Sequence, residues 1–176
     1  ELRALAAESI SCERVGIWEY NNDISTIKAD FIYILSKGEC IAGSTASEKD
    51  YPVYFQHLKA NALIIANDAI TNIATAEFAE DYLKPEGITS MLDIPIRSGN
   101  KVIGVVCCEH VGPKREWTIA EQMFIRSLSD IIAINYEKEQ RRLAEVLLQK
   151  NHLRFEETQE LAKIGSWEYN FMTYEV

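Results

Sequence analysis

The stretch from Ser90 to His110, which reads SMLDIPIRSGNKVIGVVCCEH, constrains the fold more than any other part of the chain. Two runs of strand-forming residues flank Gly99-Asn100, and this pair suits a two-residue hairpin turn because glycine readily adopts the positive φ that such turns require. A turn there places Ser98 opposite Lys101. Regular pairing then continues as Ile96 with Ile103, Ile94 with Val105, Leu92 with Cys107 and Met91 with Cys108.

The two faces of this hairpin differ in polarity, because successive side chains of a strand point to opposite sides of the sheet. One face is entirely apolar and requires a cover of helices; it carries Leu92, Ile94, Ile96, Ile103, Val105 and Cys107. The other face is mixed, as the wall of a cavity often is, and carries Met91, Asp93, Pro95, Gly104, Val106, Cys108 and His110. Gly104 indicates either the close approach of a backbone or ligand, or a β-bulge or tight helix contact.

The remaining segments predict short strands and helices around the hairpin. The expected strands cover residues 15–20, 28–36 and 63–66. The expected helices cover residues 2–9, 52–60 and 74–83, and a long helix begins at the capping-box pair Thr118 and Glu121. For the helix at 52–60 we favour a start at Pro52 over one at the capping-box pair Thr45 and Glu48.

The long helix changes composition along its length. Its first part presents a stripe toward the sheet, formed by Phe124, Leu128, Ile131, Ile132 and Asn135. From Lys138 the sequence is rich in charge, and apolar residues recur at heptad-like spacing at Leu143, Val146, Leu147, Leu153 and Leu161. Lys150 and Glu157 interrupt the seam. This part is either a solvated connector helix or a parallel two-stranded coiled coil, and we favour the coiled coil.

Composition excludes several classes of protein. The net charge of −9 over 176 residues, without a local basic patch, argues against a nucleic-acid partner. No apolar run approaches the roughly 20 residues of a membrane span, and the N-terminal residues lack the pattern of a signal peptide, so we expect a cytoplasmic location. Since the first residue is not methionine, we expect a segment of a longer protein. The cysteines Cys12, Cys40, Cys107 and Cys108 and the three histidines lack metal-ligand spacing, which predicts reduced thiols and no metal site.

The hairpin, the following REWTIAEQMFIRSLSDIIAINYE and the upstream YPVYFQHLKANALIIANDAITN resemble GAF domains of bacterial multidomain signalling proteins. The final LAKIGSWEYNFMTYEV resembles the truncated start of a PAS domain. The resemblance implies a GAF domain over residues 1–138, a connector helix over 139–160 and the PAS segment over 161–176. It also implies an α+β fold with a central antiparallel sheet of five to six strands, helices on both faces and a long C-terminal helix.

A GAF domain of this kind implies a regulatory sensory role. The domain would either bind a small molecule or relay a conformational signal. The signal would pass through a homodimeric connector helix to the PAS domain and an output domain. The fragment itself is then not an enzyme, and the expected output enzyme is the histidine kinase of a two-component system or a diguanylate cyclase. In this arrangement helices 2–9 and 119–136 cover the apolar face of the hairpin, and the cavity lies beneath helices 52–60 and 74–83.

The side chains expected around the ligand are Trp18, Tyr54, Phe55, Asp68, Asp93, Cys108 and His110. Asp93 is the strongest of them, because a carboxylate that points inward from a central strand requires a partner. No cysteine adjoins a histidine, and the Asp-x-Cys-Phe run is absent, so a covalent bilin is not expected; the cyclic-nucleotide signature Asn-Lys-x-Phe-x3-Asp-Glu is absent too. The ligand is therefore unidentified. Two alternatives are a methionine-sulfoxide reductase that uses Cys108 and Cys40, and a ligand-free dimerisation module.

Overall fold

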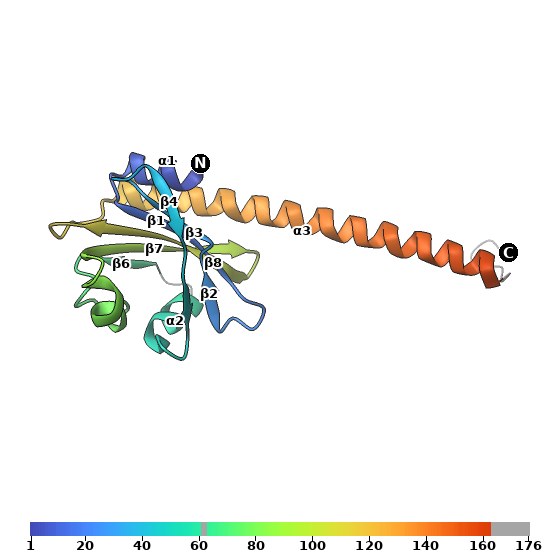
Figure 1. The fold of residues 1–176 in the computed structure, drawn as a ribbon, viewed down its shortest axis with the longest axis horizontal. Coiled ribbons are helices and arrows are strands. Elements are labelled where there is room, and N and C mark those ends of the chain that lie inside the picture. The colour runs from blue at the N-terminus through green and yellow to red at the C-terminus, as the bar shows by residue number, and fades with distance from the viewer. Residues whose placement is uncertain (61–62, 163–176) are drawn as a thin grey trace. The chain divides into compact units, whose positions relative to one another are not determined.

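The computed structural model describes residues 1–60 and 63–162 of the chain (Figure 1). It contains two compact units, Glu1–Tyr136 and a second unit that begins at Glu137. The first unit is an α+β structure built on an antiparallel sheet. The segment predicted to begin a PAS domain lies almost wholly outside the described residues, so that prediction stays untested.

The sheet of the first unit has eight strands among the described residues, and six of them follow the order β4-β3-β1-β8-β7-β6. The strands are β1 (Arg14–Tyr20), β2 (Thr26–Lys28), β3 (Phe31–Ile34), β4 (Glu39–Ala42), β5 (Thr45–Ser47), β6 (Ile64–Ala66), β7 (Ile88–Ser98) and β8 (Lys101–Val111). Strand β2 branches from β1 and pairs with β5. The two additional short strands make the sheet larger than the five to six strands expected.

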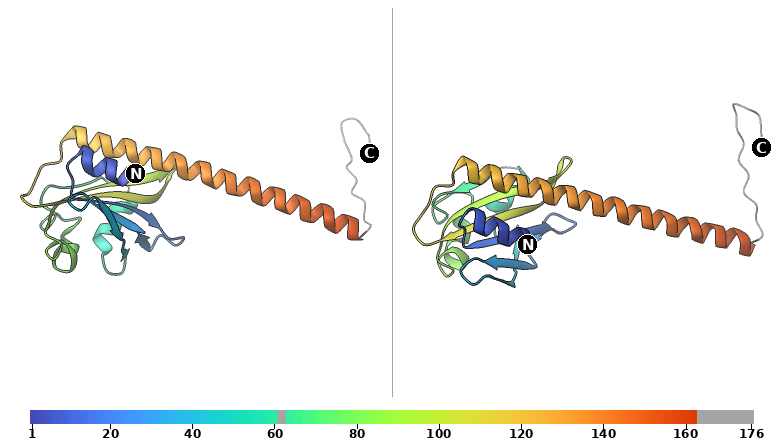
Figure 2. Two further views of the ribbon diagram at one scale, coloured as in Figure 1. Left: turned by 45° about the horizontal axis from the view of Figure 1, so that its top comes forward. Right: turned by 90° about the horizontal axis from the view of Figure 1, so that it is seen from above.

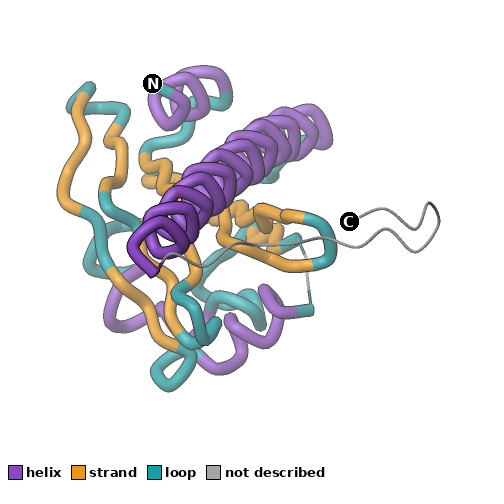
Figure 3. The backbone as a smooth tube through the Cα atoms, turned by 90° about the vertical axis from the view of Figure 1, so that its right-hand side faces the viewer, coloured by secondary structure: helices purple, strands orange, loops and turns teal. Residues whose placement is uncertain are grey.

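Helices cover both faces of the sheet. On one side lie α1 (Leu2–Ser9) and the first part of α3 (Ile119–Ala162), side by side over the strands (Figures 2 and 3). On the other side lie α2 (Pro52–Lys59), the 3-10 helix η1 (Ala76–Phe78) and the π-helix η2 (Ala79–Leu83) (Figure 1). Each side has its own apolar core, and the sheet separates the two. We call the side of α1 and α3 the helix face, and the side of α2 and η2 the cavity face.

The hairpin turns where the sequence predicts it, but the register beyond the turn differs. Ser98 pairs with Lys101, and Gly99 has a φ of 57°, which confirms the turn at Gly99-Asn100. Arg97 then pairs with Val102, whereas Ile96 pairs with Gly104, so Ile103 forms a β-bulge. The expected pairs from Ile96 onward are therefore wrong by one residue: Ile94 faces Val106, Leu92 faces Cys108 and Met91 faces Glu109.

This one-residue slip turns every following β8 side chain to the opposite face, because the side-chain period of a strand is two. Val105 and Cys107, predicted under the terminal helices, belong to the core of the cavity face. Val106 and Cys108, predicted on the mixed face, belong to the core of the helix face. Strand β7 is oriented as predicted: Leu92, Ile94 and Ile96 lie on the helix face, and Met91 on the cavity face.

Gly104 lies directly beside the bulge at Ile103. A Cβ at this position would lie 2.2 Å from the backbone oxygen of Trp18, so the close approach of another backbone excludes every larger residue. Of the readings of Gly104 offered by the sequence, the close backbone and the neighbouring bulge are both present. The contact fixes how β8 meets β1, where Gly104 pairs with Glu19.

Local signals set the other boundaries with mixed success. Helix α2 begins at Pro52 as predicted. Helix α3 has the predicted capping box: Glu121 N donates to Thr118 Oγ1 at 3.3 Å, and Thr118 N donates to Glu121 Oε2 at 2.8 Å. The strand expected over residues 28–36 is present but shorter: β3 covers Phe31–Ile34, and Lys28 belongs to β2, which pairs with β5. The helix expected over residues 74–83 consists instead of η1 and η2.

The buried stripe of α3 is rotated from the predicted one. Ile131 and Asn135 are exposed, and the side chains that enter the core of the helix face are Phe124, Ile125, Leu128, Ile132 and Ala133. These positions follow the i, i+3, i+4, i+7 spacing of one helix face. In the second unit Leu143, Val146, Leu147 and Leu153 are exposed, and the coiled coil stays a prediction. No described helix is long and apolar enough to cross a bilayer.

Candidate functional site

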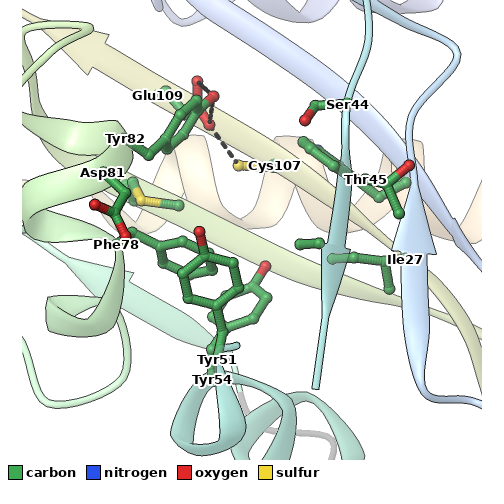
Figure 4. A pocket seen from close by; sticks show the side chains of 13 residues that line it. Ile27, Ser44, Thr45, Tyr51, Tyr54, Phe78, Asp81, Tyr82, Cys107 and Glu109 are labelled. Carbon is green, nitrogen blue, oxygen red and sulfur yellow. Dashed lines mark hydrogen bonds between the residues drawn. The ribbon is translucent and has the colours of Figure 1, made fainter. Parts of the chain in front are cut away.

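A pocket of about 190 Å³ opens on the cavity face of the sheet (Figure 4). Its floor comes from β1, β7 and β8, its walls from α2, η1 and η2, and its rim from residues 44–46. The lining residues are Trp18, Ile27, Ser44, Thr45, Ala46, Tyr51, Tyr54, Phe78, Asp81, Tyr82, Met91, Cys107 and Glu109. Ser44, Thr45 and Asp81 are exposed, whereas Cys107 and Glu109 are buried, so the pocket runs from solvent down to the sheet.

Aromatic rings form one wall of the pocket. Tyr51 and Tyr54 stand three residues apart at the start of α2, which places both on the side that faces the sheet. The ring of Phe78 from η1 packs against both, with centroid distances of 4.1 Å to Tyr51 and 4.8 Å to Tyr54. Tyr82 continues this wall at 6.4 Å from Phe78. The helix start at Pro52 thus determines which rings reach the pocket.

A buried carboxyl group lies directly behind the pocket lining. Asp93 of β7 pairs with Cys107 of β8, and Tyr54 Oη donates a hydrogen bond of 2.6 Å to Asp93 Oδ2. Burial raises the pKa of Asp93 to about 7, although hydrogen bonds from Cys107 and Tyr54 work in the opposite direction. Asp93 Oδ1 has no hydrogen-bond partner among the described residues. The group is therefore poised to gain or lose a proton near neutral pH.

The charge of a second buried carboxylate is compensated by an arginine. Glu109 of β8 lies opposite Arg14 of β1, and Arg14 Nε donates to Glu109 Oε2 at 2.8 Å. Tyr82 Oη donates to the same carboxylate, at 2.8 Å from Oε1, and Arg14 Nη1 pairs with Glu86 at 2.7 Å. Burial raises the pKa of Glu109, and the positive charge of Arg14 opposes this shift. The Arg14 charge thus allows Glu109 to stay ionised at the pocket floor.

Cys107 links the two carboxyl groups. Its Sγ donates to Glu109 Oε1 at 3.5 Å, and Cys107 lies opposite Asp93 across the β7–β8 pair. Burial, followed by the charges of Asp93 and Glu109, holds the pKa of this thiol well above its usual value. A continuous polar chain therefore crosses the pocket floor from Arg14 through Glu109, Cys107 and Asp93 to Tyr54. A thiol kept protonated in this way is a poor nucleophile, so the arrangement suits binding better than catalysis.

Four of the seven side chains expected around the ligand lie at or near this pocket. Trp18 and Tyr54 line it, and Asp93 lies directly behind it. Phe55 is fully buried one layer further back, where its ring contacts those of Tyr20 and Tyr54. The residue types at these positions were thus a usable guide to the cavity face.

The other three expected side chains lie elsewhere. Asp68 follows β6 on the surface and forms an ion pair of 2.6 Å with Lys114. Cys108 is buried in the core of the helix face, beside Cys12. His110 follows on the same side of β8, where burial lowers its pKa. Cys108 and His110 were misplaced because the bulge at Ile103 reverses the faces of β8.

The same error hid two residues that line the pocket, Cys107 and Glu109, because the regular register turns them away from the cavity. Arg14, Tyr82 and Phe78 were also missed, and no local pattern marks them as a site. Gly104 is a glycine inside a strand, and a bulge assumed there would have placed Cys107 and Glu109 on the cavity face. Among the described residues no group of His, Cys, Asp and Glu is arranged to hold a metal ion.

An antiparallel sheet with its terminal helices on one face and a small pocket beneath short helices on the other is the architecture of a GAF domain. The GAF domain family model matches residues 1–136, so the chain belongs to this family. None of the curated proteins compared with the chain by sequence matches it.

Several solved structures share this fold. The blue-light absorbing form of the Thermosynechococcus elongatus PixJ GAF domain aligns with a TM-score of 0.67 at 14% identity, over 86% of this chain and 89% of that one. The GAF domain of a two-component sensor histidine kinase from Bacillus halodurans aligns with a TM-score of 0.60 at 22% identity, over 80% of this chain and 95% of that one. At these identities the similarity defines the fold and leaves the ligand open.

Proposed function

We propose that residues 1–136 are a regulatory sensory domain that binds a small molecule in the pocket of the cavity face. The observation that carries this proposal is the pocket itself, which combines an aromatic wall with a buried polar chain. Buried polar groups are costly unless they are satisfied, and Asp93 Oδ1 has no hydrogen-bond partner among the described residues. The lining offers a ligand both ring faces and polar groups, including the carboxylates of Asp81 and Glu109.

Strand β8 connects the pocket to the terminal helices. Its cavity side carries Cys107 and Glu109, while its helix side carries Val106 and Cys108, which share a core with Leu128 of α3. A ligand that shifts this strand alters packing on both faces, because protein cores are close-packed. Differential binding of about 1–3 kcal/mol between two states is enough for such a switch. We propose that a dimeric connector over residues 139–160 carries the change to a PAS domain and an output enzyme.

The reductase alternative conflicts with the geometry of its two cysteines. Cys40 pairs with Tyr33, Tyr33 with Val15, and Val15 with Cys108, so three strand spacings separate the two thiols. At about 4.8 Å per spacing this is about 14 Å, far more than the roughly 6 Å between the Cα atoms of a disulfide. Cys108 is also fully buried, and its thiol pKa is raised. We therefore favour a sensor over an enzyme for this domain.

Two adjacent cysteines offer a matched pair for testing the proposal. A metabolite library is screened for thermal stabilisation of the full chain, and each hit is repeated with Cys107→Ala and Cys108→Ala. We expect at least one hit, with an affinity that changes in Cys107→Ala, which alters the pocket, and not in Cys108→Ala, which alters the opposite core. A ligand at a hundred times its Kd stabilises by about 2.7 kcal/mol, so such binding is measurable. No hit, or a response to Cys108→Ala alone, contradicts the proposal.

The ligand-free dimerisation module is the second candidate, and the exposed apolar side chains of α3 favour it. Leu143, Val146, Leu147 and Leu153 are all about half exposed in the single chain. We expect sedimentation equilibrium to give a dimer for the full chain and a monomer for Leu147→Glu together with Leu143→Glu. A dimer that forms while no ligand enters the pocket would favour this candidate over the sensor.

A further inference from the structure

We infer that the pocket selects a small organic cation, such as a methylated or primary ammonium ion. The inference rests on the proposed function, since it names the class of ligand for the same pocket. It follows from the charges around the pocket and from the chemistry of its walls. The pocket volume of about 190 Å³ also lies below the roughly 300–1,000 Å³ usual for drug-sized ligands, so the ligand has few heavy atoms.

The charged side chains that line the pocket are acidic. They are Asp81 of η2 and Glu109 of β8, and the lining contains no lysine, arginine or histidine. Arg14 contacts the lining residue Glu109 from outside the lining, and its guanidinium is already engaged by Glu109 at 2.8 Å and Glu86 at 2.7 Å. Asp81 has no ion-pair partner among the described residues. A ligand with a negative charge would therefore enter beside carboxylates without any free basic group to receive it.

The aromatic wall provides the second part of the argument. Trp18, Tyr51, Tyr54, Phe78 and Tyr82 all line the pocket, and the faces of such rings attract cations. One of these rings already holds a cation, since the Arg14 guanidinium lies 5.7 Å from the Tyr82 centroid. Figure 4 shows the Asp81 carboxylate on the same side of the pocket as Phe78, to the left of the Tyr51 side chain in this view.

Asp81 and Tyr51 interact electrostatically. Burial, and then the negative charge of Asp81, raises the pKa of the Tyr51 hydroxyl. A cation placed between this carboxylate and the ring faces would contact both at once, because ammonium groups with apolar substituents bind to ring faces while they keep their charge. The exposed position of Asp81 at the rim also places the charge where a cation enters.

Three probes of the same shape separate charge from size. The first is choline, the second is its uncharged isostere in which a carbon replaces the nitrogen, and the third is the tert-butylacetate anion. Binding to the full chain is measured by isothermal titration calorimetry. We expect choline to bind about tenfold more tightly than the isostere, from the usual strength of cation–π contacts, and the anion to bind more weakly than both.

Two pairs of variants place the binding in the pocket. Asp81→Asn removes a lining charge, whereas Glu80→Gln removes the neighbouring exposed charge of η2 that is paired with Lys84 outside the pocket. Tyr51→Leu removes a lining ring, whereas Phe31→Leu removes an exposed ring of β3. We expect choline affinity to fall several-fold in the first member of each pair and to stay unchanged in the second.

The outcomes distinguish this inference from the proposed function. If the isostere or the anion binds as tightly as choline, or if Asp81→Asn leaves choline affinity unchanged, the inference is wrong while the pocket remains a ligand site. If no probe binds and the metabolite screen also finds no ligand, both fail together. If the screen yields a pocket ligand that is an anion, only the inference fails.

Discussion

Replacing Asp93 by asparagine measures the cost of holding an ionisable carboxyl group behind the pocket. The amide oxygen of the introduced asparagine would still accept the hydrogen bond that Tyr54 Oη donates, which is 2.6 Å long in the native protein. The substitution keeps the shape of the side chain and removes its titration. We expect Asp93→Asn to become more stable relative to the native protein as the pH rises.

The magnitude follows from the pKa of Asp93, which is about 7 in the folded protein and 3.8 in its ordinary environment. At about 1.4 kcal/mol per pKa unit, the difference corresponds to about 4 kcal/mol. Because the folded pKa is the higher one, the folded state binds more protons at this residue between these two values. Native stability is therefore fully present below about pH 4, falls as the pH rises toward about 7, and is constant above that.

The assay is urea unfolding followed by tryptophan fluorescence, at several values between about pH 4 and pH 8. Every other titrating group is common to both proteins, so the difference between their free energies of unfolding isolates Asp93. We expect this difference to change by up to about 4 kcal/mol in favour of Asp93→Asn over this range. The control is Asp68→Asn, because the pKa of Asp68 is lowered. The difference between the free energies of unfolding of Asp68→Asn and the native protein should therefore be constant above about pH 5. Parallel curves for Asp93→Asn and the native protein would refute the reasoning.

Three further predictions use the same unfolding assay. Arg14→Met leaves the buried Glu109 carboxylate without its cation and should lower the free energy of unfolding by about 3–5 kcal/mol. Adding Glu109→Leu should restore part of this loss, and a double variant whose loss equals the sum of the two single losses contradicts the ion pair. Gly104→Ala forces a Cβ against the backbone of β1 and should lower the free energy of unfolding by on the order of 2 kcal/mol. The loss should exceed that of Gly38→Ala, because a Cβ at Gly38 meets open space and only the positive φ opposes it. Thr118→Ala removes the α3 cap and should cost about 1 kcal/mol, and no loss would mean that the cap is dispensable.

Candidate-site residues could be predicted from the sequence only where their side-chain direction follows from local pattern. Trp18 alternates within a short strand, and Tyr54 follows a proline that starts a helix, so both were found. Asp93 was found because β7 runs without irregularity from Met91 to Ile96. Arg14 and Tyr82 come from distant parts of the chain, and they join Glu109 only in the folded protein. Their role depends on contacts that no local pattern encodes.

The sequence by itself determined the hairpin turn, the orientation of β7 and the starts of α2 and α3. Each of these depends on residues within a few positions of one another, such as a glycine in a turn or a threonine at a helix end. The tertiary structure decided which face of β8 lines the pocket. That choice depends on the bulge at Ile103, and Gly104 beside it must lie against the backbone of β1, more than eighty positions earlier in the chain. Because a strand alternates with a period of two, that single non-local contact placed Cys107 and Glu109 in the pocket and Cys108 beneath the terminal helices.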